Sequence, residues 1–161
     1  MATITLDGAT DLLHYQLRTA LTMEHDSLTA LGELATAAKS AEIKKLFRHH
    51  ADETKEQIDN LHKVFELMGW KRATAPSAAT KGIGKQAGAM IERSGPTMVD
   101  RVVLAAALGN EHYEISAYQA LLAPVQAMHN ADAEALLLVN LDQETHTSEE
   151  LHTTLVRISG D

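Results

Sequence analysis

The chain has 161 residues, of which 22 are acidic, 14 are basic and nine are histidine, and it has no cysteine. The absence of cysteine excludes disulfides, iron–sulfur clusters, thiolate zinc sites and a cysteine nucleophile. The formal net charge is −8, and an acidic chain repels phosphate backbones, so we expect no nucleic acid among its partners.

The length and an apolar content of 45% suit one domain that spans residues 1–161. We expect a cytoplasmic protein with no membrane partner. The N-terminal sequence does not resemble a signal peptide, and no apolar run approaches the roughly 20 residues of a membrane span. Aromatic residues make up 4% of the chain, and the abundance of alanine and leucine favours helices over strands.

Two long helices are predicted in the first half of the chain. Apolar residues recur at helical spacing from about residue 10 to 38, and again from about 41 to 68. Ser40 suits the N-cap of the second helix, and Gly69 suits the position that ends it. The turn between the two helices is short, which predicts that they are antiparallel neighbours.

The second half of the chain begins with a break from residue 70 to about 80, followed by a short helix over 81–93 that three glycines weaken. A third long helix is predicted over 97–123, where Pro124 should kink or end it. Asp132 then suits the N-cap of a fourth long helix over 133–158. The predicted fold class is all-α, a ferritin-like four-helix bundle of two antiparallel hairpins with a long crossover that carries a short extra helix.

Each long helix places a glutamate within or beside its apolar stripe. At 100° per residue, Glu24, Glu111 and Glu144 lie at the centres of three stripes, and Glu114 lies one turn beyond Glu111. Glu53 falls toward the edge of the fourth stripe. All of these positions are near the middle of their helices, which places the carboxylates at a similar depth in the predicted bundle.

Such a cluster of carboxylates needs compensation, because buried carboxylates lose hydration and repel one another. Most lysines and arginines fall on the outer faces of the predicted helices. Two divalent metal ions would balance four carboxylate charges, and hard oxygen ligands suit iron, manganese or magnesium. The pattern therefore favours metal binding over a purely structural core.

The residues that carry these carboxylates resemble motifs of the YciE/YciF family of bacterial ferritin-like proteins, which are associated with stress. The stretch Glu111-His112-Tyr113-Glu114-Ile115, followed by Tyr118, is similar to one motif of that family. His50 with Glu53-Thr54 is similar to a second motif of the family, and the spacing from Glu24 to Glu53 is the one expected for the family's first-helix glutamate. The stretch from Leu141 to Glu144 resembles the family's acidic run on the last helix. The resemblance covers about residues 11–155.

This resemblance implies a rubrerythrin-like four-helix scaffold with a dinuclear metal site. In such sites two helices each supply one glutamate, and the other two each supply a Glu-x-x-His pair. The sequence departs from that pattern, because Glu53 is followed three residues later by Glu56, and Glu144 by Thr147. Gln57 also stands where the family often has histidine.

His50 lies one turn before Glu53 and could replace one missing histidine, while Glu56 or Glu114 could add an oxygen. We therefore expect the metal ligands to come from a set of six carboxylates and one imidazole: Glu24, Glu53, Glu56, Glu111, Glu114, Glu144 and His50.

Two functions stay open on the sequence. The first is a protein that binds two divalent metal ions, iron in preference to manganese. If such a protein is an enzyme, it oxidises Fe(II) or reduces peroxide in stress protection. The second is a metal-free helical bundle that acts as a structural or partner-binding module, which the missing histidines favour.

Apolar Leu12, Val103 and Leu138 fall off the main stripes, so we expect them to be exposed and the chain to form a homodimer.

Overall fold

The computed structural model describes residues 5–160, and within that range the chain forms helices and no strand. This confirms the predicted all-helical class. The bounds of the helices are α1 Ala9–Ala37, α2 Ala41–Leu67, α3 Ala78–Glu92, α4 Val99–Ala127 and α5 Ala131–Ser159. The four long helices begin and end within a few residues of the predicted bounds at most of their termini.

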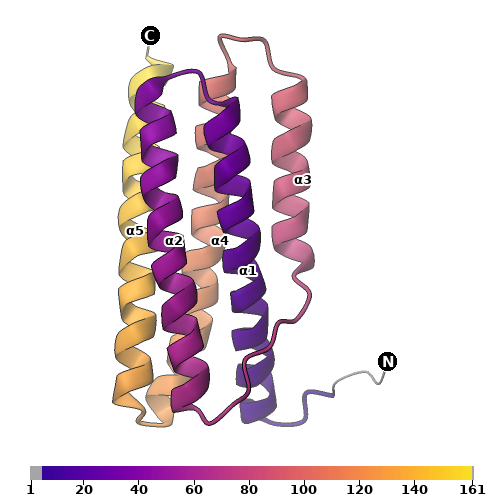
Figure 1. Cartoon of the computed structure of the whole chain (residues 1–161), viewed down its shortest axis with the longest axis vertical. Coiled ribbons are helices and arrows are strands. Elements are labelled where there is room, and N and C mark those ends of the chain that lie inside the picture. The colour runs from indigo at the N-terminus through magenta and orange to yellow at the C-terminus, as the bar shows by residue number, and fades with distance from the viewer. Residues whose placement is uncertain (1–4, 161) are drawn as a thin grey trace.

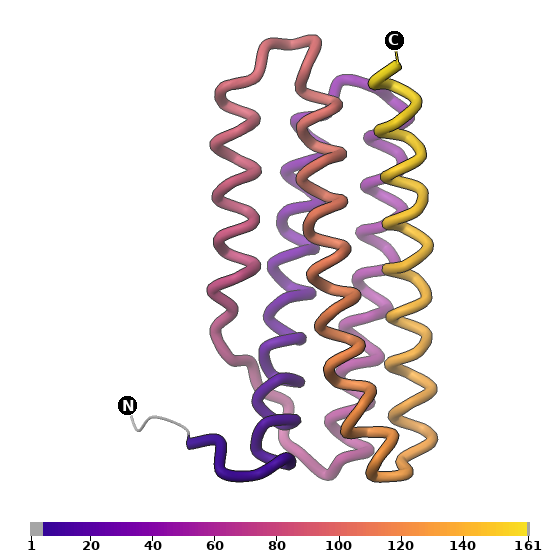
Figure 2. Tube along the Cα trace, turned by 180° about the vertical axis from the view of Figure 1, so that it is seen from behind, coloured from indigo at the N-terminus to yellow at the C-terminus, as the bar shows by residue number. Residues whose placement is uncertain are grey.

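The four long helices lie side by side with their axes close to one direction (Figure 1). α1 contacts α2 and α4, while α5 contacts α2 and α4. The shorter α3 lies outside this group and packs against α1 and α4. The view from behind shows the connection that runs from the end of α2 to the start of α3 (Figure 2). This connection is tied to α1, because the backbone N–H of Ala75 donates to the Arg18 carbonyl at 3.1 Å.

The apolar core is divided into two clusters along the length of the helices. One contains Leu17 of α1, Phe65 of α2 and Leu137 of α5, and the other contains Phe47 of α2 and Leu104 of α4. The residues that separate the two clusters along each helix are polar or charged. This division follows directly from the sequence, because each helix interrupts its apolar stripe at mid-length.

The end of α4 differs from the prediction. Pro124 lies inside the helix, which continues to Ala127. Pro124 comes in the last turn, so its missing N–H removes one hydrogen bond. Leu121 and Val125 on either side of it are about 1% exposed in the core, and this burial holds the turn in helical form.

The cap of α5 also differs from the prediction. Asn130, rather than Asp132, is the N-cap, and its side-chain oxygen accepts a hydrogen bond from the Ala133 N–H at 3.1 Å. The sequence offered both residue types within three positions, and either suits a cap. At the end of α2, Gly69 has φ +71, and the N–H of Trp70 donates to the Phe65 carbonyl at 2.9 Å. The predicted role of Gly69 as the residue that ends α2 is confirmed.

Of the three apolar residues expected to be exposed, Leu12 and Leu138 are each 44% exposed, but Val103 is fully buried. The expectation for Val103 was wrong because α4 contacts α1, α3 and α5. A helix packed on three sides buries a wider face than the single stripe that its periodicity indicates. No helix in residues 5–160 has the length and apolar character needed to cross a membrane.

The turn between α1 and α2 depends on a side chain from α4. The Asp100 carboxylate accepts hydrogen bonds from the Lys39 N–H at 2.6 Å and from the Ser40 N–H at 3.0 Å. Ser40 occupies the predicted N-cap position, but its side chain makes no cap hydrogen bond. The stabilisation of this turn therefore comes from Asp100, which is distant in sequence.

Replacing Asp100 should therefore destabilise the protein more than replacing the cap residue itself. We expect Asp100→Ala to lower the free energy of unfolding by about 1–2 kcal/mol, because two backbone donors lose a charged acceptor. Ser40→Ala is the control and should cost less than about 0.5 kcal/mol. Urea unfolding of the two variants measures both values, and equal losses would contradict the assignment.

Candidate metal centre

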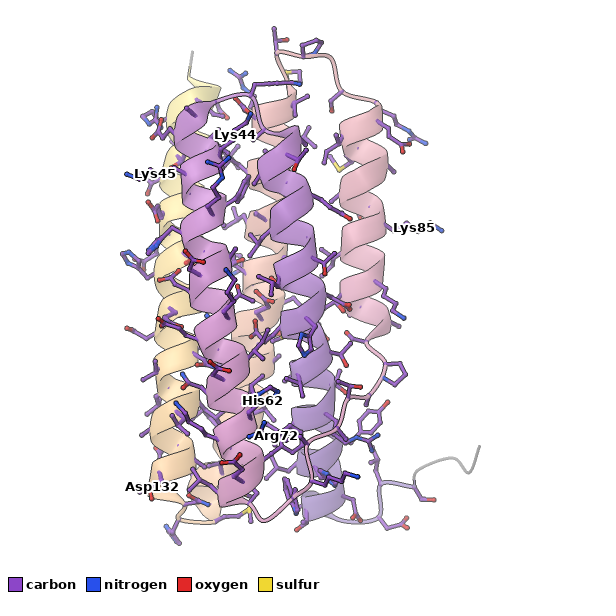
Figure 3. All side chains as sticks on the ribbon, in the orientation of Figure 1. Lys44, Lys45, His62, Arg72, Lys85 and Asp132 are labelled. Atoms are coloured by element: carbon purple, nitrogen blue, oxygen red, sulfur yellow. The ribbon has the colours of Figure 1, made fainter. Side chains whose placement is uncertain are left out.

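The polar layer between the two apolar clusters contains five fully buried side chains that carry a carboxyl or an imidazole group. They are Glu24 of α1, His50 of α2, Glu111 and Glu114 of α4, and Glu144 of α5, each no more than 1% exposed. By contrast, the charged side chains of Lys45 and Lys85 project away from the helices (Figure 3). Burial of four carboxylates in one layer is costly unless something balances their charge.

These side chains are buried because of their position in the helical repeat. Glu24 follows Leu17 by seven residues and Leu21 by three, and it precedes Leu31 by seven, so all four share one face of α1. The three leucines are at most 3% exposed. Packing this leucine face into the core carries the Glu24 carboxyl inside with it, and the same spacing argument holds on α4 and α5.

His50 is at the centre of the layer. Its Nε2 lies 3.0 Å from Oε1 of Glu111 and 3.7 Å from Oε2 of Glu144, and its Nδ1 lies 3.4 Å from Oε2 of Glu53. His50, Glu111, Glu114 and Glu144 each offer one ligand atom, and these four atoms all lie within 4.8 Å of one another. Three carboxylates and one imidazole at this separation form a compact set of metal-ligating groups.

Most of the carboxylate oxygens in the layer accept no hydrogen bond from any residue in the described part of the chain. These unpartnered buried atoms are Glu24 Oε2, Glu111 Oε2, and both oxygens of Glu114 and of Glu144. Buried polar atoms are normally paired, and each exception requires an explanation such as a proton or an ion. The six oxygens therefore define a site with unused ligand capacity.

The surroundings of the layer shift the pKa values of its groups. Burial raises the pKa of Glu24 to about 8, although the hydrogen bond from Tyr118 opposes this shift. Burial, followed by repulsion from neighbouring carboxylates, raises the pKa values of Glu114 and Glu144 well above 4.5. Burial lowers the pKa of His50, but the charge and hydrogen bond of Glu111 outweigh it and raise that pKa to about 10. Without a metal ion, the layer is thus balanced by protons on His50 and on the carboxyls whose pKa is raised.

Two of the seven predicted ligands lie outside this buried group. Glu53 is at its edge, with a 17% exposed side chain that accepts a hydrogen bond from the Thr147 hydroxyl at 3.3 Å. The hydrogen bond with His50 lowers the pKa of Glu53. Glu56 is exposed, and its Oε2 accepts from the Gln143 amide at 3.2 Å. The fold therefore brings five predicted residues together, places Glu53 beside them, and directs Glu56 elsewhere.

Sequence reasoning missed Asn140, which is fully buried in the same layer. The Asn140 amide donates a hydrogen bond to the Tyr118 hydroxyl at 3.0 Å. The Tyr118 hydroxyl in turn donates to Oε1 of Glu24. Asn140 precedes Glu144 by one helical turn, so the test of helical phase that found Glu144 also applies to Asn140. Gln57 is buried as well, and neither atom of its amide has a hydrogen-bond partner in residues 5–160.

The shifted pKa values predict that the metal-free protein loses stability as the pH rises from about 5 to about 8. A carboxyl whose pKa is raised in the folded protein stabilises the fold fully only when the pH is below 4.5. This stabilisation is lost as the pH rises through the pKa of the folded state, which is about 8 for Glu24. His50 acts in the same direction between 6.5 and about 10. Glu53 acts in the opposite direction. Its pKa is lowered, so its ionised form stabilises the folded protein, and this stabilisation is lost as the pH falls below 4.5.

Thermal unfolding of protein treated with EDTA measures this dependence. Glu24→Gln is the control, because glutamine keeps an acceptor for Tyr118 but does not ionise, so its melting temperature should change less between these pH values. A melting temperature of the metal-free wild type that rises over the same interval would contradict the account.

Known proteins are similar to this chain in sequence and in fold. The chain is 29% identical to Protein YciF of Escherichia coli strain K12 over 143 residues, which cover 88% of this chain and 86% of that protein. The crystal structure of the E. coli stress protein YciF matches with a TM-score of 0.92 at 25% identity, covering 97% of this chain and 99% of that one. YcfI of Rhodopseudomonas palustris, provisionally described as a structural protein, matches with a TM-score of 0.91 at 27% identity, covering 95% and 98%.

A protein of Xanthomonas campestris shares the fold, with a TM-score of 0.77 at 20% identity and coverage of 94% of both chains. The family that is described as a domain of unknown function, DUF892, matches residues 8–160. Together with the similarity to YciF, this match confirms the resemblance to the YciE/YciF proteins. The chain therefore belongs to the DUF892 family.

Proposed function

We propose that the chain is a ferritin-like four-helix metal protein that binds two divalent ions, iron in preference to manganese. The ligands in this proposal are the buried His50, Glu111, Glu114 and Glu144, extended by Glu24 on one side and Glu53 on the other. Iron is favoured because Fe(II) binds a given set of nitrogen and oxygen ligands more tightly than Mn(II). Glu56 is left out of the ligand set because its carboxylate is exposed and bonded to Gln143.

The observation that carries the proposal is the set of six buried, unpartnered carboxylate oxygens. Hard divalent cations prefer carboxylate oxygens, and two such ions would offset four of the five carboxylate charges. Among residues 5–160, no N–H group and no hydroxyl donates a hydrogen bond to any of these six oxygens. The residues present therefore fit a metal site, even though the usual Glu-x-x-His pairs are missing from the sequence.

Residues around the site hold its ligands in place. The Tyr118 hydroxyl bonds one oxygen of Glu24 and leaves Oε2 free, and Thr147 bonds Oε2 of Glu53. Such supporting hydrogen bonds fix the orientation of ligands and their basicity. His50 must release a proton to serve as a ligand, because a metal ion needs the lone pair of a neutral imidazole. The two apolar clusters on either side limit access of water.

A bound pair of Fe(II) ions would supply two electrons, which with two protons reduce one hydrogen peroxide to two waters and leave two Fe(III). The two protons would come from water, because the bound ions displace the protons of His50 and of the carboxyls that act as ligands. The E. coli relative is described as a stress protein, which supports a role in protection against oxidants. We place this role in the cytoplasm, as part of the same proposal.

Metal content tests the proposal. Protein purified without chelator and loaded anaerobically with Fe(II) should retain two ions per chain after gel filtration, measured by elemental analysis. Glu144→Gln should lose most of this iron, because it removes a buried carboxylate charge, whereas Glu149→Gln on the exposed face of the same helix should keep it. Retention of no iron or manganese by the wild type would end the proposal, and one ion per chain would end its dinuclear form.

A second candidate function is a metal-free, homodimeric bundle that acts as a structural or partner-binding module. Two observations favour it: Leu138, Val139 and Val156 of α5 are 44–58% exposed, and the similar R. palustris protein is provisionally described as structural. In such a protein the buried carboxylates would only cost stability.

The two candidates predict opposite effects for Glu144→Leu. Replacing an unpaired buried carboxyl by an apolar side chain should raise the melting temperature of a protein that never binds metal. If the site binds metal, the same variant should melt below the iron-loaded wild type, because it loses the stabilisation that the bound ions supply. Differential scanning calorimetry with and without Fe(II) distinguishes these outcomes.

A further inference from the structure

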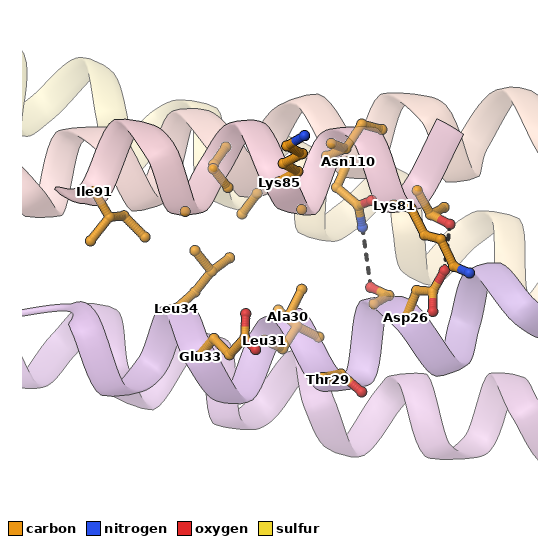
Figure 4. Close-up of a pocket in the computed structure, with 18 of the residues that line it drawn as sticks. Asp26, Thr29, Ala30, Leu31, Glu33, Leu34, Lys81, Lys85, Ile91 and Asn110 are labelled. Atoms are coloured by element: carbon orange, nitrogen blue, oxygen red, sulfur yellow. Dashed lines mark hydrogen bonds between the residues drawn. The ribbon is translucent and has the colours of Figure 1, made fainter. Parts of the chain in front are cut away.

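A pocket of about 260 Å³ lies between α3, α1 and α4. Figure 4 shows α3 and α1 facing each other across this space, with the side chains of Leu34 and Ile91 projecting into it from opposite sides. The pocket adjoins the buried layer, because its lining includes Glu111. Neither the ligand set nor the role proposed above accounts for it.

The pocket exists because the α3 side of it is built from small residues and is loosely packed. Gly84 and Gly88 line it, and a Cβ atom added at either position would meet no atom within 4 Å. Within α3, whose residues are all described, Thr80 is the one buried residue. α3 therefore covers the flank of α1 and α4 without filling the space beneath it.

The walls of the pocket are mostly apolar. They include Leu31, Leu34, Ile83, Ala87, Ile91 and Ala107. The remaining lining residues include charged side chains of both signs (Figure 4). The acidic ones are Asp26 and Glu33 on α1, and the basic ones are Lys81 and Lys85 on α3. Apolar walls disfavour a hydrated divalent cation, which would have to shed water against them, and they accept a small uncharged molecule.

One buried polar group at the pocket has no partner. Glu111 lines the pocket, is 1% exposed, and its Oε2 accepts no hydrogen bond from the described residues. Beside it, the amide of Asn110 donates to the Ser27 hydroxyl at 3.1 Å, so α4 and α1 are linked at this point (Figure 4). The pocket thus borders a carboxylate of the proposed metal centre.

We propose that this pocket is the access route by which a small uncharged oxidant, dioxygen or hydrogen peroxide, reaches the buried carboxylate layer. The inference rests on the proposed function for the role of the oxidant, but the route itself is a property of α1, α3 and α4. Gly84 and Gly88 keep it open, and the loose packing of α3 allows the small movements that admit a molecule past Asn110 and Ser27.

The sequence offers a matched pair of variants to test the route. Gly84→Leu places a large side chain on the lining of the pocket, where its Cβ meets open space. Gly82→Leu makes the same change one-half turn earlier on α3, at an exposed residue that does not line the pocket. Both variants remove a glycine from a helix and gain a similar amount of helix stability, roughly 1 kcal/mol, so they differ in whether the pocket is filled.

Xenon under pressure probes the pocket without any metal. In wild type and in Gly82→Leu, xenon should shift the methyl NMR signals of Ala107 and Leu31, because apolar cavities bind this gas. These shifts should disappear in Gly84→Leu. Shifts that persist in Gly84→Leu, or that are missing from the wild type, would overturn the route.

Stopped-flow oxidation of the Fe(II)-loaded protein, with dioxygen and hydrogen peroxide as separate arms, gives the second readout. Gly84→Leu should keep its iron content but react at least about tenfold more slowly with the oxidant that uses the pocket, a barrier increase of roughly 1.4 kcal/mol. Gly82→Leu should match the wild type. Unchanged rates with both oxidants in iron-loaded Gly84→Leu would overturn the route alone, whereas absence of iron from the wild type would overturn the proposed function and leave the xenon result standing.

Discussion

The structure depends on how the charge of one buried layer is balanced. Glu24, Glu111, Glu114 and Glu144 come from three helices and surround His50, so that the layer combines four acids with one base in the middle of the protein. Such a layer is less stable than an apolar one unless protons or cations compensate it. Its presence divides the core into two apolar clusters and explains why each long helix interrupts its apolar stripe at mid-length.

In the metal-free protein, protons provide this balance. The imidazole of His50 stays charged because its raised pKa of about 10 exceeds neutral pH, and burial keeps carboxyls such as Glu24 protonated well above 4.5. A metal ion would replace these protons and use oxygens that otherwise have no partner. Tyr118 and Asn140 then hold one side of the layer, and the pocket beneath α3 meets it at Glu111. The candidate site, its supporting hydrogen bonds and the proposed access route thus lie in contact with one another.

The sequence predicts those features that follow from helical phase alone. Glu24, Glu111 and Glu144 could be recognised as buried because they share a helix face with leucines, and Asn140 was open to the same test. Features that depend on contacts between helices could not be predicted in this way. Val103 is buried because α4 has neighbours on three sides, and the pocket beneath α3 depends on where a separate helix rests.

We propose above all that metal ions replace protons in the buried carboxylate layer. Isothermal titration of EDTA-stripped protein with Mn(II), in two buffers of different ionisation enthalpy, counts the protons released for each ion bound. We expect binding with net release of protons near pH 7, since His50 and the carboxyls with raised pKa values must give them up. Absence of binding, or binding that releases no protons, would contradict it.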